Sequence, residues 1–125
     1  MTTVKSIDNS QDVIDSREVI ERIDYLAYLD DEPEAERDED DWKELQALRA
    51  LAEEAEGYAA DWKYGEALIR ESYFTEYARE LAEDIGAVKD DATWPNNCID
   101  WDEAARLLKQ DYTTVDFDGV DYYIR

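Results

Sequence analysis

The chain has 125 residues, of which 35 are Asp or Glu, 13 are Lys or Arg and none is His, so its formal net charge is −22. Such a charge repels polyanions, so it excludes nucleic acid, anionic membranes and acidic substrates as direct partners and favours a basic protein. Hydrophobic residues make up 44% of the chain and aromatic residues 12%, which is enough to build one folded core and unlike a disordered acidic sequence.

The carboxylates are spread along the chain, with 20 acids and 7 bases in residues 1–64 and 15 acids and 6 bases in residues 65–125. The charge is therefore not that of an acidic tail. The lone Cys98 excludes an internal disulfide and a zinc site built from cysteines, and it favours a reducing cytoplasm. The sequence shows no signal-peptide pattern and no apolar run approaching about 18 residues, so we expect a soluble cytoplasmic protein.

The first predicted elements are a tail and a helix. Residues 1–11 are polar and unpatterned, and we expect a flexible N-terminal tail. Asp15 and Glu18 have the spacing of a capping box, which predicts a helix from there to about Leu29. Its apolar residues recur at helical spacing and are Val19, Ile20, Ile23, Leu26 and Ala27.

A second helix follows an acidic segment. Residues 30–44 hold ten acids against Arg37 and Lys43, so we expect this segment to be solvated. Its first part, broken by Pro33, is predicted to be a loop. Residues 38–41 lie before or in the first turn of the helix, where carboxylates interact favourably with the helix dipole. The helix is predicted to end at Gly57, and its apolar stripe is Trp42, Leu45, Leu48, Ala52 and Ala55.

The C-terminal half predicts two more helices. Residues 65–69 are short and apolar enough to form a strand. Ser72 is the expected cap of a third helix that ends at Gly86, with the stripe Phe74, Tyr77, Ala78, Leu81 and Ile85. Asp100 and Glu103 form a second capping box, which opens a fourth helix with Trp101, Ala104, Ala105 and Leu108 on one side.

The chain ends in a predicted hairpin. Asp118-Gly119 is a type I′ turn pair between two alternating segments, and it pairs Phe117 with Val120 and Val115 with Tyr122. We expect Trp101 and Phe117 in the core, and residues 67–69 as a third strand. The fold class is α+β, with about four helices packed on a small antiparallel sheet. Residues 12–125 are predicted to be one domain, in which a helical pair with an acidic loop (12–64) precedes a βααββ unit (65–125).

Few residues are suited to catalysis or to metal binding. Without His, Cys98 has no catalytic partner, and no nucleophile or phosphate-binding motif occurs, so we predict a protein without enzymatic activity or cofactor. A carboxylate pair in a cleft stays open as an alternative. Asp116, Asp118 and Asp121 resemble a calcium loop, but Gly119 stands at the wrong position and a turn explains the run. No metal site is predicted, and weak divalent-cation binding by residues 30–41 is the alternative.

The geometry of the acids is the remaining signal. In the third helix Glu76, Glu80 and Glu83 follow one another at i, i+4 and i+7, and Asp84 extends that face. Residues four apart lie about 6 Å apart along a helix axis, close to the step between successive phosphates on a DNA strand. We therefore predict phosphate-mimicking carboxylates that bind a basic partner, here and in the acidic segment at Asp30, Asp31, Glu32, Glu34, Glu36, Asp38, Glu39, Asp40, Asp41 and Glu44.

The C-terminal half contains Tyr77-Ala78-Arg79 with Glu83, Gly86 and Ala87, then Ile99-Asp100-Trp101 with Arg106-Leu107, then a hairpin with Gly at its turn. With these motifs, residues 72–125 resemble the C-terminal domain of ArdA-type antirestriction proteins. The resemblance implies an acidic cytoplasmic protein of a phage, plasmid or transposon that mimics bent B-form DNA and occupies the DNA groove of a type I restriction-modification enzyme. It assigns the mimicking role to the carboxylates of the third helix.

These observations predict a DNA mimic that blocks a restriction-modification enzyme, a CRISPR effector or another nucleic-acid-binding defence protein, as a monomer or a homodimer. The main alternative is an acidic adaptor or structural protein that docks on a basic protein surface without imitating DNA. A third is halophilic adaptation, because the charge exceeds the magnitude of about 8 that is usual for a small domain. A DNA mimic displaces DNA from its target, whereas an adaptor need not. A halophilic domain should unfold at low salt.

Overall fold

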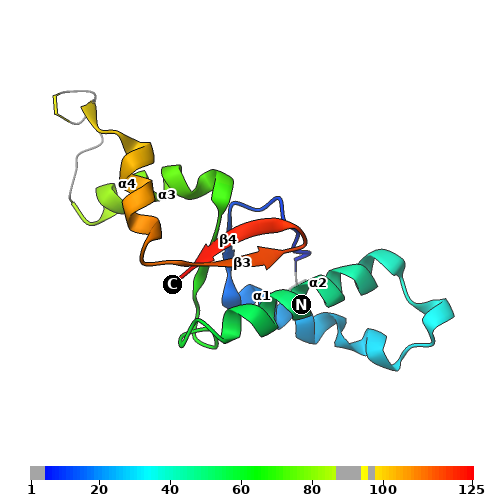
Figure 1. Ribbon diagram of the computed structural model, residues 1–125. Coiled ribbons are helices and arrows are strands. Elements are labelled where there is room, and N and C mark those ends of the chain that lie inside the picture. The colour runs from blue at the N-terminus through cyan, green and yellow to red at the C-terminus, as the bar shows by residue number, and fades with distance from the viewer. Residues whose placement is uncertain (1–4, 87–93, 96–97) are drawn as a thin grey trace.

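A computed structural model of the chain describes residues 5–86, 94–95 and 98–125 (Figure 1). Within these residues it contains four α-helices and one four-stranded antiparallel sheet, so the predicted α+β class is confirmed. The elements in order are β1 (Val13–Asp15), α1 (Ser16–Leu26), the 3₁₀ turns η1 (Ala27–Asp31) and η2 (Glu34–Glu36), α2 (Glu39–Glu56), β2 (Ala67–Arg70), the 3₁₀ turn η3 (Glu71–Tyr73), α3 (Phe74–Asp84), α4 (Trp101–Lys109), β3 (Thr113–Phe117) and β4 (Val120–Ile124).

The C-terminal hairpin has the predicted register. Phe117 pairs with Val120, and Val115 pairs with Tyr122. Asp118 and Gly119 have φ angles of 50° and 87°, the left-handed conformation that a type I′ turn requires at both central residues. The sheet order is β1-β2-β4-β3, so β2 is the third strand that the sequence predicts next to the hairpin.

The N-terminal segment corrects two expectations. Residues 13–15 form an edge strand, β1, that pairs with β2, whereas the sequence predicts only a helix start there. The flexible tail is wrong for residues 5–11, because Ile7 is 3% exposed and belongs to the core. The Tyr122 hydroxyl also donates a hydrogen bond to the Gln11 carbonyl at 2.5 Å. The strand joins residues 12–64 to the same sheet as the C-terminal half.

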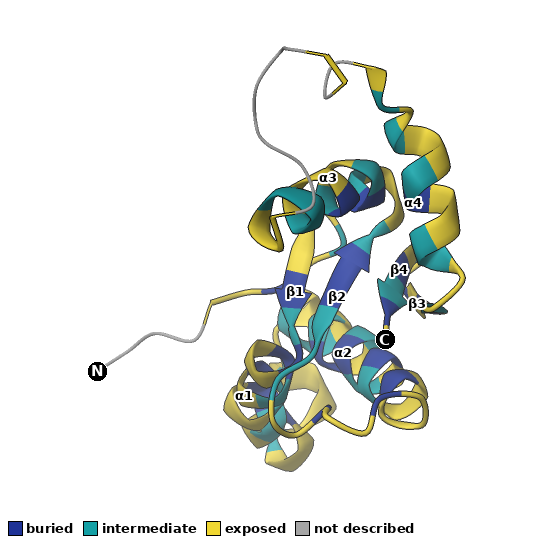
Figure 2. Cartoon of the chain, turned by 90° about the vertical axis from the view of Figure 1, so that its left-hand side faces the viewer, coloured by how far each residue is buried: buried dark blue, intermediate teal, exposed yellow. Residues whose placement is uncertain are grey.

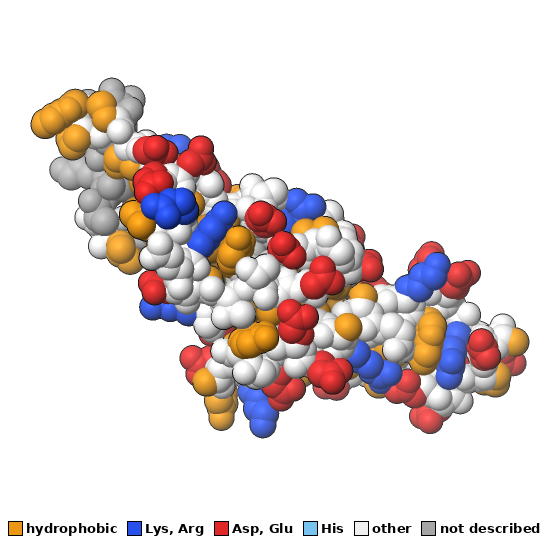
Figure 3. Space-filling view, in the orientation of Figure 1, with side chains coloured by type: hydrophobic (Ala, Val, Ile, Leu, Met, Phe, Trp, Pro, Cys, Tyr) orange, Lys and Arg blue, Asp and Glu red, His pale blue; other side chains and the backbone are white. Residues whose placement is uncertain are grey.

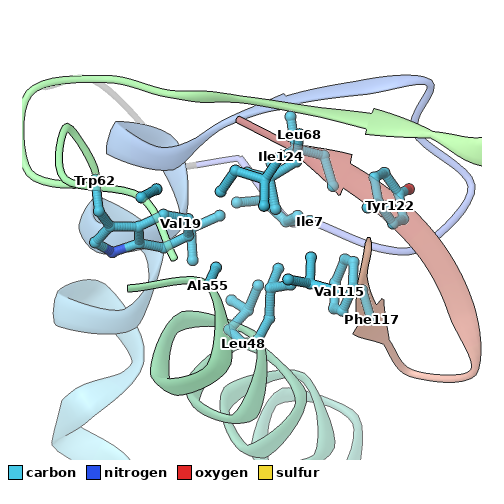
Figure 4. Close-up of a cluster of buried hydrophobic side chains, with 13 residues drawn as sticks. Ile7, Val19, Leu48, Ala55, Trp62, Leu68, Val115, Phe117, Tyr122 and Ile124 are labelled. Carbon is cyan, nitrogen blue, oxygen red and sulfur yellow. The ribbon is translucent and has the colours of Figure 1, made fainter. Parts of the chain in front are cut away.

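Helices cover both faces of the sheet. Tyr122 and Leu68 face α1 and α2, whereas their chain neighbours Tyr123 and Ile69 face α3 and α4. Figures 1 and 2 show the two helix pairs on opposite sides of the strands. The larger core lies under α1 and α2, and Figure 4 shows its members Val19, Leu48, Ala55, Trp62, Leu68, Val115, Phe117, Tyr122 and Ile124.

An aromatic cluster fills the second core, between the sheet and the pair α3 and α4. The ring of Phe74, which is fully buried, lies 4.9 Å from that of Tyr123, 5.2 Å from that of Tyr112 and 5.6 Å from that of Tyr77, measured between centroids. Ala105 of α4 and Ala78 of α3 complete the contact. Phe117, in the first core, is 2% exposed as predicted.

Trp101 is not a core residue, contrary to the prediction. It is only partly buried, and it belongs to none of the three buried clusters in the described part of the chain. The first turn of α4 lies at the end of that helix farthest from the sheet (Figure 1). Trp101 lies on the same face of α4 as Ala105, but the sheet does not extend as far as Trp101. Ala105 is therefore the buried residue of this helix.

The helix ends follow the predicted caps in part. The carboxylates of Asp15, Asp38 and Asp100 each accept a hydrogen bond from a backbone N–H in the first turn of α1, α2 and α4. The first helix ends at Leu26 rather than Leu29, and η1 continues the chain. Ser72 does not cap α3, because its hydroxyl accepts from Arg70 instead.

Candidate functional site

The predicted carboxylates of α3 lie on its outer side. Glu76, Glu80 and Asp84 are exposed and Glu83 is half-buried, whereas Phe74 and Ala78 on the other side are in the core. The i, i+4, i+7 spacing therefore becomes a row of carboxylates along the helix, as the sequence predicts. Such a row is held in place by a helix that is itself anchored through an aromatic core.

Among the residues that the structure describes, two of these four carboxylates have partners. The Tyr73 hydroxyl donates a hydrogen bond to Glu80 at 2.7 Å, and this bond, with minor help from burial and nearby negative charge, raises the pKa of Tyr73 to about 12. Arg79 lies 3.3 Å from Glu83, four residues on. Both contacts are at the surface, so they orient the carboxylates without removing them from solvent.

The acidic segment 30–44 is more ordered than the solvated loop expected. Arg49 of α2 donates two hydrogen bonds of 2.9 and 2.5 Å to the carboxylate of Asp30. These bonds lower the pKa of Asp30. Arg37 stacks its guanidinium 4.0 Å above the ring of Trp42 and donates to the Leu29 carbonyl. The short turns η1 and η2 are thus tied to α1 and α2. Exposed carboxylates in this segment include Asp31, Glu34, Glu36 and Asp40.

The structure corrects the prediction that Glu44 is a carboxylate that binds a partner. Its side chain is only 12% exposed, and its carboxylate is paired with Arg22 of α1 at 2.6 Å. It also accepts hydrogen bonds from the Ser6 hydroxyl and the Ile7 amide. Glu44 therefore holds the fold together, and we remove it from the set that could contact a partner. The expectation that nothing in this segment is buried fails at this residue.

The structure does not bring the two predicted groups together. The row on α3 lies at one end of an elongated body, and the turns η1 and η2 lie at the other (Figure 1). Asp and Glu side chains are distributed along the length of the visible face, with Lys and Arg among them (Figure 3). Six ion pairs join described residues, but they leave the net charge unchanged.

Sequence reasoning missed one surface feature, a groove between the N-terminal segment, α2 and the β3–β4 turn. It adds Asp8 and Asp118 to the acidic surface beside Asp40. These residues are 110 positions apart at most, and no local pattern relates them. Only the assembled sheet, which places the hairpin turn beside residues 6–9, could reveal them.

The described residues contain no group of three or more acidic or cysteine side chains arranged to hold a metal ion. None of their helices is both long and apolar enough to cross a membrane. Comparisons of the chain with family models, with curated proteins and with solved structures found no match. The resemblance to ArdA-type proteins therefore stays a prediction from the sequence.

Proposed function

We propose that this protein is a non-enzymatic DNA mimic that inhibits a nucleic-acid-binding defence protein by occupying its basic cleft. One observation carries the proposal. A net charge of −22 is displayed by a folded, elongated body with acidic groups at both ends. A protein that binds duplex DNA presents Lys and Arg side chains to a long, regular array of phosphates, and a body of this kind offers carboxylates to the same side chains.

The anchoring of α3 on the sheet supports mimicry over simple charge. Successive carboxylates on one helix face are about 6 Å apart along the axis, and the buried Phe74 fixes the helix on the sheet. The backbone that carries the carboxylates is ordered before binding, so no backbone conformational entropy is lost when the partner engages them. A flexible acidic chain of equal charge lacks this advantage.

The proposed targets are type I restriction-modification enzymes and CRISPR effectors of a bacterial host. The test is a competition experiment in which a purified target holds a fluorescent DNA duplex and the acidic protein is added. Displacement of the duplex at physiological salt, at a concentration well below that needed for a polyglutamate of equal charge, would support mimicry. Displacement only at the polyglutamate concentration, or none with either class of target, would contradict it.

A second candidate function is that of an adaptor that docks on a basic protein surface without imitating DNA. The groove beside Asp40 favours it, because a defined concave site suits a particular peptide segment rather than a phosphate backbone. The same experiment separates the two. An adaptor binds its partner while the duplex stays bound, so the complex would contain all three components.

A further inference from the structure

The strand β3 forms one edge of the sheet, because the strand order is β1-β2-β4-β3. It has five residues, whereas β1 at the other edge has three. An edge strand presents backbone N–H and C=O groups with which another extended chain can pair. In the described part of the chain, β3 is therefore the longer of the two strands that an added strand could join.

The register of the hairpin identifies the backbone groups of β3 that point outward. Phe117 and Val120 flank the two-residue turn and form a hydrogen-bonded pair, and such pairs alternate along the strands with pairs whose backbone groups point away from each other. Thr114 and Asp116 belong to the second kind, so each directs one N–H and one C=O away from β4. No hydrogen bond joins the outward groups of Thr114 to another of the described residues.

The Asp116 amide confirms this direction. It donates to the Glu54 carboxylate of α2 at 3.4 Å, which is longer than the usual upper limit of about 3.2 Å for such a bond. Both residues are exposed. A mobile surface carboxylate therefore stands where the carbonyl oxygen of an added strand would accept, and it can be displaced at small cost.

Two carboxylates oppose each other at this edge. Asp116 of β3 lies directly opposite Asp121 of β4, and both are exposed. Like charges at directly opposite positions of a sheet are destabilising. The Asp116 carboxylate accepts from the Gly119 amide at 3.4 Å, a neutral donor, and no ion pair between described residues involves either aspartate. A cation beside Asp116 would relieve the repulsion.

We propose that β3 binds an extended segment of the basic partner as a fifth, antiparallel strand in which basic and apolar side chains alternate. The inference rests on the proposed function only in that the partner is basic. In such a strand the residue that hydrogen-bonds to Asp116 shares its face of the sheet, so an Arg or Lys there pairs with the carboxylate. The intervening residues share the face of Val115 and Phe117, which belong to the core under α1 and α2, so apolar side chains suit them.

A second copy of this chain does not suit the same edge. Two β3 strands paired with each other would bring Asp116 and Glu54 of both copies together, on bodies with a net charge of −22 each. Charged side chains at an edge are one way in which natural sheets avoid pairing with their own copies. The same carboxylates attract a basic strand, so the charge of this edge favours a basic partner over a copy.

The test is a titration of the isotope-labelled full-length protein with the capped pentapeptide Val-Arg-Val-Arg-Val, followed by amide chemical shifts and hydrogen exchange. Two N-methylated forms with the same charge are the controls. Backbone methyl groups on both arginines block the peptide edge that would pair with β3, whereas methyl groups on two valines block the opposite edge.

We expect slower hydrogen exchange of the Thr114 and Asp116 amides with the parent peptide and with the valine-methylated form. The arginine-methylated form loses two backbone hydrogen bonds and should bind about tenfold or more weakly. Equal binding of the two methylated forms, shifts spread over all acidic surfaces, or no binding of the parent peptide would overturn the inference.

Two charge-matched variants complete the test. Asp116→Asn keeps the outward backbone groups and should weaken binding of the parent peptide by about two- to fivefold, the effect of one exposed ion pair. Asp31→Asn removes the same charge from η1, at one end of the body (Figure 1), and should leave the affinity within about 1.5-fold, because salt screens distant charges. Equal weakening by both variants would overturn the pairing at Asp116. Duplex displacement that persists in that case would leave the proposed function standing.

Discussion

The Arg22 guanidinium in α1 and the Glu44 carboxylate in α2 form an ion pair with an Nε–Oε2 distance of 2.6 Å, and their side chains are only 9% and 12% exposed. The same carboxylate accepts hydrogen bonds from the Ser6 hydroxyl at 2.8 Å and the Ile7 amide at 3.3 Å. One acid of a strongly acidic surface thus links the N-terminal segment to both helices under the sheet.

Replacement of Glu44 by Ala should lower the free energy of unfolding by about 3 kcal/mol, near the lower end of what is lost when one partner of a buried ion pair is removed. The cost arises because Arg22 would stay buried after losing the carboxylate that it is paired with. Glu39→Ala is the matched control: it removes the same charge, but its pair with Lys43 is exposed. Urea unfolding of both variants checks this, and equal stability of the two would refute the structural role of Glu44.

The pair also predicts a pH dependence. Burial acts to raise the pKa of Glu44, but hydrogen bonds from Arg22, Ser6 and Ile7 together with the charge of Arg22 outweigh it, so its pKa lies below the ordinary value of 4.5. The unfolded chain therefore binds this proton more readily, and the stabilisation is present above pH 4.5 and lost as the pH falls through the folded-state pKa.

The measurement is the difference in free energy of unfolding between the natural protein and Glu44→Gln as a function of pH. It should be constant near neutrality and shrink below about pH 4.5. The difference between the two proteins matters here, because protonation of the other carboxylates affects both alike. A difference that grows on acidification would mean that the pKa is raised in the folded state.

Phe74→Ala should destabilise the protein by about 3 to 5 kcal/mol, the usual cost of removing a buried aromatic side chain, because Phe74 is the centre of the ring cluster under α3 and α4. Trp101→Ala should cost about 1 kcal/mol, as is common outside a core. Thermal and urea unfolding compare the two variants. A larger loss at Trp101 than at Phe74 would show that the start of α4 is packed more tightly than described.

Elements built from local contacts were predicted best. The β3–β4 hairpin depends on Asp118-Gly119 and on alternation over five residues either side, and the two residue pairs that the sequence predicts are both confirmed. The strand β1 was missed because it has three residues and finds its partner, β2, more than 50 positions along the chain. Ile7 was missed for a similar reason, since one apolar residue in a polar stretch has no period.

The candidate site was predictable only where it lies on one element. The row on α3 follows from helical spacing, because residues four apart share a face. The role of Glu44 does not follow, since an acid among nine others in residues 30–44 carries no sign that Arg22 will lie beside it. The groove needs three chain segments at once, so only the assembled fold defines it.

Salt distinguishes mimicry from halophilic adaptation. The fold depends on two apolar cores on either side of the sheet, so we expect cooperative unfolding and a folded state at about 10 mM salt, where the Debye length is about 30 Å and self-repulsion is strongest. Higher salt should raise the midpoint modestly by screening that repulsion. Circular dichroism against temperature checks it; loss of the folded state at 10 mM would favour the halophile explanation.

Within the mimic account, no single carboxylate of α3 dominates. Each exposed charge pair contributes little, so Glu80→Gln alone should change inhibition of a target by less than about fivefold. A binding hot spot behaves differently, because one substitution there removes most of the affinity. Dose–response curves for the single variant check this, and abolition of inhibition by this one substitution would point to a hot spot instead.

DNA mimicry by α3 can be tested with two quadruple amide variants, by measuring how well each displaces duplex DNA from the target over a salt series. Neutralising Glu76, Glu80, Glu83 and Asp84 should weaken displacement by several-fold to about a hundred-fold and flatten its salt dependence, with the fold intact. The control removes equal charge from exposed acids elsewhere, and its smaller effect would confirm that position matters. The control positions are Glu18, Glu21, Asp24 and Asp121. No loss of duplex displacement in the α3 variant at any salt, or an equal loss in the control variant, would contradict mimicry by α3.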